Sequence, residues 1–170
     1  KDDDELLEAK LTTGNSQILL AVKSGKAIRF EENKTRPMGR NASGVRGITL
    51  NGPTDEVIGM VSVSDPETEI LVVSENGYGK RTSFLEYRVT NRGGKGIIGI
   101  INSPRNGNVS STLVVDESDE IILSTDKGSV MRCAVKEIRV AGRNTQGVTI
   151  KKLSGSEKVV SAIKIEDNIE

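Results

Sequence analysis

The chain has 170 residues and no formal net charge, with 24 basic and 24 acidic side chains, which is enough sequence for one domain with a hydrophobic core. With one cysteine and no histidine, it cannot form an intramolecular disulfide, and it lacks the commonest general base and metal ligand at neutral pH. No apolar run approaches the roughly 20 residues of a membrane helix, and the acidic start does not resemble a signal peptide. The composition disfavours a zinc protein, a thiol enzyme and a membrane protein, and it fits a reducing compartment.

The first segment, residues 1–16, is predicted to be a strand. In DELLEAKL, residues 4–11, Leu7, Ala9 and Leu11 alternate with charged residues, as in a half-buried strand. A helix is the other interpretation of this segment. We favour the strand because the repeats described next place the closing strand of a preceding unit here.

Three segments of the chain align with one another without gaps in their central part. Their turn glycines, Gly25, Gly77 and Gly128, are 52 and 51 residues apart, and each is followed 19 positions later by a second glycine. Three arginine columns follow each turn glycine at +4, +11 and +15: Arg29, Arg81 and Arg132; Arg36, Arg88 and Arg139; and Arg40, Arg92 and Arg143. Nine arginines in three matching columns indicate a true repeat.

Each repeat is predicted to contain about four β-strands. An apolar run such as ILLAV (residues 18–22) leads to a glycine turn of hairpin type, a second strand and a loop rich in Gly, Asn and Arg. A short strand (residues 45–50 in the first repeat) and an alternating closing strand complete the unit. We therefore expect an all-β, propeller-like fold with repeats at about 17–63, 69–115 and 120–165. Three blades leave open ends, so residues 1–170 are predicted to be one part of a longer wheel.

The charge of the chain is neutral in sum but segregated along the sequence. Residues 23–50 carry +5, residues 77–100 carry +4 and residues 127–152 carry +6, whereas the acids gather in the turns before the opening strands and at the ends. If equivalent positions fall on one rim, the arginines form a cationic belt, which is suited to the phosphates of a polyanion. The alternative is structural, with arginines pairing with carbonyls or with an acid of the neighbouring blade. This alternative applies most to the +4 column, which lies inside a strand.

Two other features argue against single-stranded nucleic acid and against a dinucleotide as the ligand. Aromatic residues are only 2% of the chain and occupy unmatched positions, so no base-stacking platform for single strands emerges and backbone binding of a duplex fits better. Gly94, Gly96 and Gly99 match G-x-G-x-x-G, but Pro104 leaves no room for the helix that a dinucleotide site needs. Cys133 lies in an apolar strand, and we interpret it as core packing.

Four stretches in order carry a family resemblance: RPMGRNASGVRGI, VSENGYGKRT, EYRVTNRGGKGI and VAGRNTQGV. Over essentially its whole length, the chain resembles the C-terminal domain of bacterial DNA gyrase A. The resemblance implies a β-pinwheel, a six-bladed relative of the propeller whose blades exchange strands, with roughly the last three blades present here. It also implies that duplex DNA wraps around a basic outer rim, so that the ATP-driven holoenzyme can introduce negative supercoils.

The same resemblance implies where the chemistry lies. The cleavage tyrosine belongs to the N-terminal part of gyrase A, and ATP with its magnesium is bound elsewhere in the holoenzyme, so no catalytic residue, cofactor or metal is expected in this chain. The expected partners are duplex DNA, the rest of gyrase A and gyrase B, in the bacterial cytoplasm at the nucleoid and not at a membrane. TNRGGKG, residues 90–96, matches the last five positions of the family's basic box, whose complete copy we expect upstream of Lys1. The predicted DNA-binding residues are Arg29, Arg36, Arg40, Lys80, Arg81, Arg88, Arg92, Lys95, Arg132, Arg139 and Arg143.

Three alternatives remain at this point. The corresponding domain of topoisomerase IV would select DNA geometry, but its repeats are typically fewer and more divergent. A propeller-type protein-interaction scaffold would present aromatic or apolar patches, which the low aromatic content disfavours. An enzyme acting by itself comes last.

Overall fold

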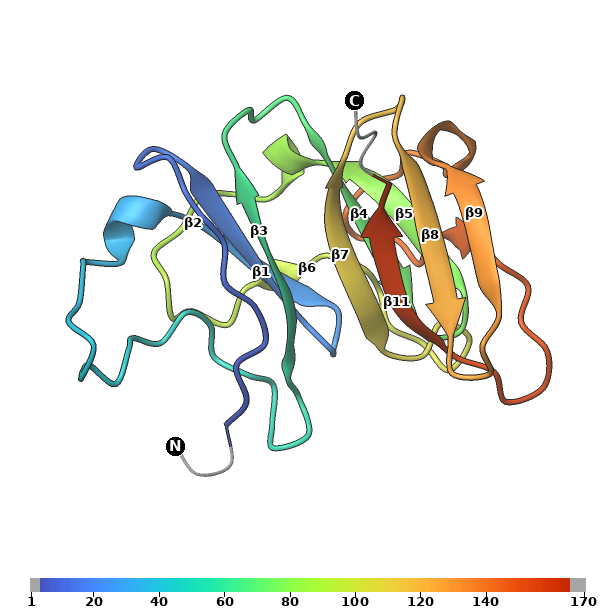
Figure 1. The fold of residues 1–170 in the computed structure, drawn as a ribbon, viewed down its shortest axis with the longest axis horizontal. Helices are drawn as coiled ribbons and strands as arrows, with labels where there is room; N and C mark the ends of the chain where they lie inside the picture. Colours follow the sequence, from blue (N-terminus) through green and yellow to red (C-terminus); the bar gives the residue numbers. More distant parts are fainter. Residues whose placement is uncertain (1–3, 166–170) are drawn as a thin grey trace.

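The computed structural model describes residues 4–165 and confirms an all-β fold of three antiparallel sheets (Figure 1). No helix within this range is long and apolar enough to cross a membrane. We call the sheets blade 1, with the strand order β3-β1-β2-β6, blade 2, with the order β10-β5-β4-β7, and blade 3, with the order β11-β8-β9. The strands are β1 Gln17–Val22, β2 Lys26–Glu31, β3 Val57–Val63, β4 Glu69–Ser74, β5 Tyr78–Ser83, β6 Ile97–Ile98, β7 Val109–Val115, β8 Glu120–Thr125, β9 Val130–Ala134, β10 Val148–Thr149 and β11 Val159–Lys164.

The fourth strand of a blade comes from the next repeat. β6 pairs with β2 in the register Lys26 to Ile98, and β10 pairs with β5 in the register Gly79 to Val148. Each sheet therefore has three strands from its own repeat and, in blades 1 and 2, one strand donated by the following repeat. This strand exchange is the feature that distinguishes a β-pinwheel from a simple propeller, and it links each blade to the next through backbone hydrogen bonds.

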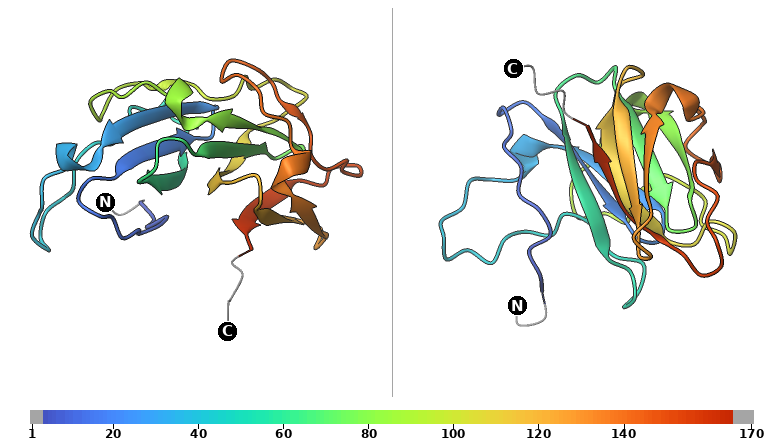
Figure 2. Two further views of the ribbon diagram at one scale, coloured as in Figure 1. Left: turned by 90° about the horizontal axis from the view of Figure 1, so that it is seen from above. Right: turned by 45° about the vertical axis from the view of Figure 1, so that its right-hand side comes forward.

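The three blades fan out as an arc (Figure 2). The closing strands lie on the inner side, where β3 packs against β7 and β7 packs against β11. β2, β5 and the segments that follow them lie on the outer side. Two apolar clusters fill the spaces between successive blades, one including Leu19 and Ile70, and the other including Leu71 and Leu123.

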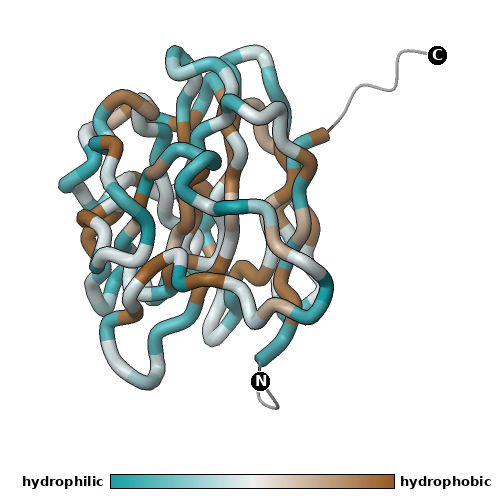
Figure 3. The backbone as a smooth tube through the Cα atoms, turned by 90° about the vertical axis from the view of Figure 1, so that its left-hand side faces the viewer, coloured by the Kyte–Doolittle hydropathy of each residue, from teal (hydrophilic) through white to brown (hydrophobic). Residues whose placement is uncertain are grey.

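Burial along the strands follows this arrangement. β4, in the middle blade, is buried at every position from Ile70 to Ser74 because neighbouring blades cover both faces of its sheet. β8, in blade 3, alternates between buried and half-buried residues, as expected for a sheet covered on one face. Figure 3 colours the backbone by hydropathy and shows hydrophobic and hydrophilic stretches following one another closely along the chain.

Two predicted strands are not observed. Residues 4–16 contain no strand, and Leu7 and Leu11 are exposed. The physical reason is that a closing strand pairs with the opening strand of its own blade, and both edges of β1 are occupied by β2 and β3. Residues 45–50 also form no strand, because the matching strands β6 and β10 pair with the preceding blade, and no blade in this structure precedes blade 1.

Candidate nucleic-acid interface

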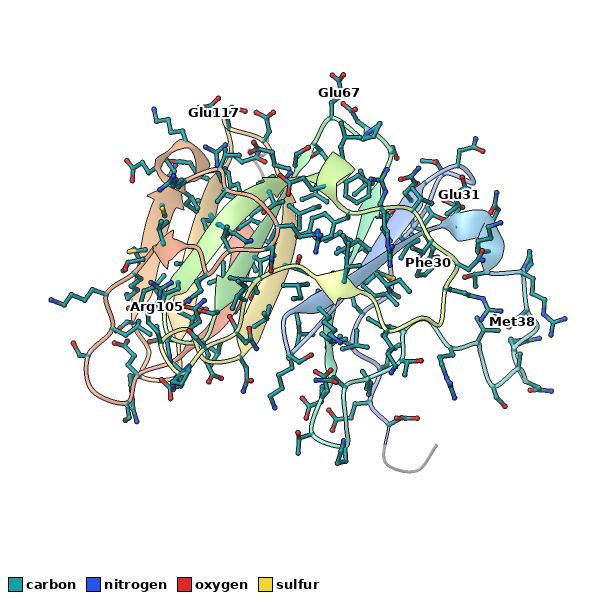
Figure 4. All side chains as sticks on the ribbon, turned by 180° about the vertical axis from the view of Figure 1, so that it is seen from behind. Phe30, Glu31, Met38, Glu67, Arg105 and Glu117 are labelled. Carbon is teal, nitrogen blue, oxygen red and sulfur yellow. The ribbon has the colours of Figure 1, made fainter. Side chains whose placement is uncertain are left out.

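The basic loops follow the second strand of each repeat. Short 3-10 helices, η1 Glu32–Lys34, η2 Phe84–Glu86 and η3 Val135–Glu137, end β2, β5 and β9 at matching positions. We call the segments after them, residues 35–47, 87–96 and 138–147, the rim loops. They lie on the outer side of the arc, which Figure 4 shows from behind. Positive φ at Gly96 (69°) and Gly147 (74°) lets each loop return into the exchanged strand.

The +11 column is the exposed set. Arg36, Arg88 and Arg139 are all exposed, and no ion pair links them to any carboxylate of residues 4–165. In repeats 2 and 3 the preceding residue is a buried anchor, Tyr87 or Ile138, at 1% and 2% exposure. Because the anchor side chain points into the core, the next side chain along the extended segment points away from it. The Arg40 and Lys95 side chains are also exposed.

The +15 column connects blades. The Arg92 Nε donates to the Lys34 carbonyl at 2.9 Å, and its Nη1 donates to the Arg46 carbonyl at 3.1 Å. The Arg143 Nη1 donates to the carbonyl of Ile98, which occupies the position in repeat 2 that Arg46 occupies in repeat 1. Both arginines are half-buried, with part of each side chain facing solvent. Arg92 braces η1 and the end of the blade 1 rim loop, and Arg143 contacts the exchanged strand β6.

The +4 column is structural where a following blade covers it. The Arg29 Nη1 donates to the carbonyls of Phe84 and Tyr87 at 2.8 and 2.9 Å, and its guanidinium lies 3.9 Å from the centroid of the Phe84 ring. Its Nε donates to the Gln17 Oε1 at 2.6 Å. Burial lowers the pKa of Arg29 from its ordinary value. Arg29 is 6% exposed, so the prediction that it contacts DNA does not fit this structure.

The same correction applies to Arg81. Its Nε donates to the Ile138 carbonyl, and its Nη1 forms an ion pair with Glu69, both at 2.7 Å. In blade 3 the equivalent Arg132 forms an ion pair with Glu120, but no blade covers it and its side chain is 64% exposed. The carbonyl-pairing alternative for this column is therefore observed in repeats 1 and 2, whereas the ion pairs of Arg81 and Arg132 are made with an acid of the same blade and not of the neighbouring blade.

Lys80 is also removed from the contacting set, because it is fully buried beneath the rim loop of blade 3. Its Nζ donates to the carbonyls of Gly142, at 2.6 Å, and Arg143, and to the Thr145 Oγ1 at 3.0 Å. Desolvation lowers the pKa of Lys80 to about 8. The aligned residue in repeat 1 is Ile28, whose Cδ1 lies under Gly94 of the blade 2 loop. The Lys80 ammonium thus fixes the shape of the loop that carries Arg143.

A basic cleft that the column analysis missed lies at the junction of blades 2 and 3. It has a volume of about 510 Å³, and its charged lining residues are Arg105, Lys151, Lys152, Glu157 and Lys158. These residues come from two separate segments and do not repeat in the other blades. Only the adjacent pair of lysines stands out in the sequence, so periodicity could not have found the cleft. The described residues contain no cluster of three metal-ligating side chains.

The repeated blades, with exchanged strands and arginines at the junctions, can now be compared with known proteins. The family described as "DNA gyrase C-terminal domain, beta-propeller" matches residues 17–64, 68–116 and 119–166. The chain belongs to this family. It is 44% identical over 168 residues to the DNA gyrase A protein of Staphylococcus epidermidis, covering 98% of this chain and 19% of that protein. It is 41% identical over 169 residues to the DNA gyrase A protein of Salmonella typhimurium, covering 99% and 19%. The chain thus spans about a fifth of the length of these relatives.

Solved structures of the family's fold agree with the sheet topology. The C-terminal domain of a DNA topoisomerase IV superposes with a TM-score of 0.91 at 26% identity, covering 98% of this chain and 51% of that one. A DNA gyrase A C-terminal domain gives a TM-score of 0.83, also at 26% identity, covering 91% and 52%. The gyrase family member described here therefore has a β-pinwheel fold and fills about half of each of these domains.

Proposed function

We propose that the chain is the duplex-binding part of a gyrase-type topoisomerase, and that it binds the DNA backbone along its rim loops. The observation that carries the proposal is the +11 column: Arg36, Arg88 and Arg139 are exposed at matching positions of three successive blades. Arginine suits phosphate oxygens through its planar fork, and regularly spaced cations suit a backbone that carries one charge per ~1.7 Å of duplex axis. In the whole protein, such a rim would wrap DNA so that the holoenzyme introduces negative supercoils.

The proposal assigns a graded role to the predicted residues. Arg36, Arg40, Arg88, Lys95 and Arg139 contact phosphates directly. Arg92 and Arg143 hold the rim loops and offer part of their guanidinium surface. Arg132, at the uncovered end of blade 3, forms an outlying contact through its exposed side chain. No catalytic step is assigned to this chain, and the ATP-dependent reaction would take place in the rest of the enzyme.

The test is duplex affinity as a function of salt concentration. The variant Arg36→Gln/Arg88→Gln/Arg139→Gln removes three exposed charges, so we expect the log–log salt slope to become less steep by up to ~2.7, at about 0.9 per phosphate contact. The loss should be the same for unrelated duplex sequences, because phosphate contacts carry no base information. Fluorescence anisotropy with labelled duplexes measures both quantities.

A matched control removes the same charge elsewhere. Lys10, Lys23 and Lys164 each lie within 4 Å of a carboxylate, at 2.7, 3.6 and 3.4 Å, so their replacement by Gln should leave the salt slope nearly unchanged. If the control and the rim variant lose affinity equally, the rim loops are not the binding surface. If the unaltered chain shows no salt-dependent duplex binding, the proposed function is wrong.

One observation favours a second candidate, the geometry-selecting function of a topoisomerase IV domain. The topoisomerase IV structure superposes over more of the chain than the gyrase structure does, although the sequence is 44% identical to a DNA gyrase A protein. The two structures have equal sequence identity to this chain, 26%, so their superposition reports the fold and not the subfamily. We favour gyrase because of the 44% identity to a DNA gyrase A protein. A nicked circle sealed while the chain is bound separates the two candidates. Wrapping predicts linking-number changes of one sign, whereas binding without wrapping predicts none.

A further inference from the structure

The basic cleft at the junction of blades 2 and 3 is shaped and charged for an anion. Arg105 stacks on Tyr78, with 4.4 Å between its guanidinium carbon and the ring centroid, and its Nη2 donates to the carbonyls of Gln146 and Gly147 at 3.4 and 3.2 Å. Its Nε donates to the Asn106 Oδ1 at 3.0 Å. The guanidinium is therefore held in one orientation at the cleft wall, and these hydrogen bonds leave its Nη1 unused.

The cleft keeps an excess of positive charge after its internal pairs are counted. Lys158 lies 3.8 Å from Glu75 and donates to Asn76, so its charge is largely offset. Glu157 accepts from the Thr125 Oγ1 at 2.6 Å, and hydrogen bonds hold the pKa of this carboxyl down at about 2. No ion pair joins Lys151 or Lys152 to a carboxylate within the described range. Lys151 also helps to keep Glu157 ionised, so the four cations of the lining, Arg105, Lys151, Lys152 and Lys158, exceed the two carboxylates, Glu157 and Glu75. This positive excess on a polar surface does not suit an apolar ligand.

The cleft is built into the exchanged strand itself. The Lys151 amide donates to the Gly77 carbonyl at 3.0 Å, which anchors the lysine backbone to the hairpin turn of blade 2. The equivalent positions at the junction of blades 1 and 2 hold Ile100 and Ile101. The first junction therefore carries no charge at these positions. Its own cavity, of about 300 Å³, is lined instead by Arg29, Arg88 and Lys95 of the columns and the rim loop.

The position of the cleft relative to the rim loop identifies the anion. β10 begins where the blade 3 rim loop ends and leads directly to Lys151. The four backbone steps from Gly147 to Lys151 include the two strand residues Val148–Thr149 and a bend at Ile150 and Lys151, so they span at most about 13 Å, a reach comparable with the ~12 Å width of the major groove of B-DNA. The acidic turns labelled by Glu67 and Glu117 in Figure 4 lie at the other end of the sheets from Arg105. A duplex on the rim could then present the phosphates of one strand to Arg139 and those of the other strand to the cleft.

We propose that Arg105, Lys151 and Lys152 form a second phosphate-binding site for duplex DNA, across one groove from the rim loop of blade 3. The proposal rests on the proposed function, because it requires a duplex on the rim. It extends the contact surface from the exposed loops into the junction between two blades. The junction of blades 2 and 3 then contacts both strands of the duplex. The junction of blades 1 and 2 contacts only the strand that crosses its rim loop.

The test uses the variant Lys151→Gln/Lys152→Gln in the full 170-residue chain, compared with Lys10→Gln/Lys164→Gln, which has the same net charge. We expect the cleft variant to lower the salt slope on a duplex of about 40 base pairs by ~1.8 and to weaken binding at low salt at least about tenfold. A single strand of the same length cannot bridge a groove, so its affinity should fall less. Unfolding curves of the two variants should match, and Lys152→Gln, at an exposed position, gives half the effect if the double variant is unstable.

Three results would overturn the inference in different ways. If the unaltered chain binds duplex with a steep salt slope and the cleft variant behaves like its control, the cleft is not a DNA contact and the rim proposal stands. If the cleft variant loses affinity equally for duplex and for single-stranded DNA, contact across a groove is ruled out, since a single phosphate backbone would then be sufficient for the cleft to bind. If the unaltered chain fails to bind duplex at all, the rim proposal fails and the cleft proposal falls with it.

Discussion

The two blade junctions of this protein share one backbone frame and differ in what fills it. In both, the carbonyl of the turn glycine, Gly25 or Gly77, accepts hydrogen bonds from two successive amides of the next repeat, at 2.8 to 3.1 Å. In both, the +4 arginine crosses to carbonyls of the following blade. The turn glycine and the +4 arginine therefore recur because both junctions use them, whether or not the blade binds a ligand.

The differences lie beneath and beside this frame. Ile28 supports one rim loop and the buried Lys80 supports the other, while Ile100 and Lys151 occupy the same place beside the turn. The first junction is apolar at these positions and the second is cationic. Positions that do not repeat are thus free to differ from blade to blade, whereas the repeated turn glycine and the repeated +4 arginine serve the assembly of the blades.

The strongest test of the shared frame is Gly77→Ala. A Cβ at Gly77 would lie 2.2 Å from the Lys151 carbonyl oxygen, and the residue has φ of +82°. Overpacking against backbone together with left-handed strain should lower the free energy of unfolding by about 3–4 kcal/mol. Gly128→Ala is the matched control, because φ is +81° there and nothing lies within 4 Å of the added Cβ. It should cost only about 1 kcal/mol. Chemical denaturation measures both, and equal losses would mean that contact between blades does not select the glycine.

The arginine of the frame provides the next test. Arg81→Met leaves Glu69 and the Ile138 carbonyl without their donor in a buried setting, so we expect a loss of about 3 kcal/mol in unfolding free energy. Arg132→Met removes an equivalent but exposed ion pair and should cost less than ~1 kcal/mol. The same denaturation series compares them, and a cost for Arg132 as large as that for Arg81 would contradict a role set by coverage from the next blade.

Much of this fold could be predicted from the sequence because glycine and arginine recur at the same positions in each repeat of about 51 residues. The strand order within a repeat follows from the apolar runs and from turns such as Asn76-Gly77. Which blade each short strand joins does not, because Ile97 and Val148 pair with residues of another repeat. The +4 and +11 arginines cannot be told apart from the sequence, because both recur at fixed positions in every repeat. They separate only when the next blade covers Arg29 and leaves Arg88 in solvent.

The Lys80 support of blade 3 predicts a pH dependence of stability. The lowered pKa of about 8, against an ordinary value of 10.5, means that the unfolded chain binds more protons than the folded chain between these values. The free energy of unfolding should therefore rise from about pH 8 to about pH 10, by on the order of 2 kcal/mol. In Lys80→Met this contribution should be absent. The raised pKa of Tyr87 acts in the opposite direction above about pH 10, but it is common to both proteins and cancels in their difference. Parallel pH profiles would show that the Lys80 ammonium is not desolvated.

The smallest expected effect separates bracing from binding within the rim loops. Arg92→Gln removes two hydrogen bonds to the Lys34 and Arg46 carbonyls and should lower unfolding free energy by about 1 kcal/mol. Arg88→Gln changes an exposed side chain and should stay within about 0.5 kcal/mol. For duplex binding we expect the reverse order, with a larger loss at Arg88, because its whole guanidinium is available to phosphate. If Arg92→Gln weakened binding more without destabilising the chain, the half-buried +15 column would be the primary contact and the order proposed for the rim would reverse.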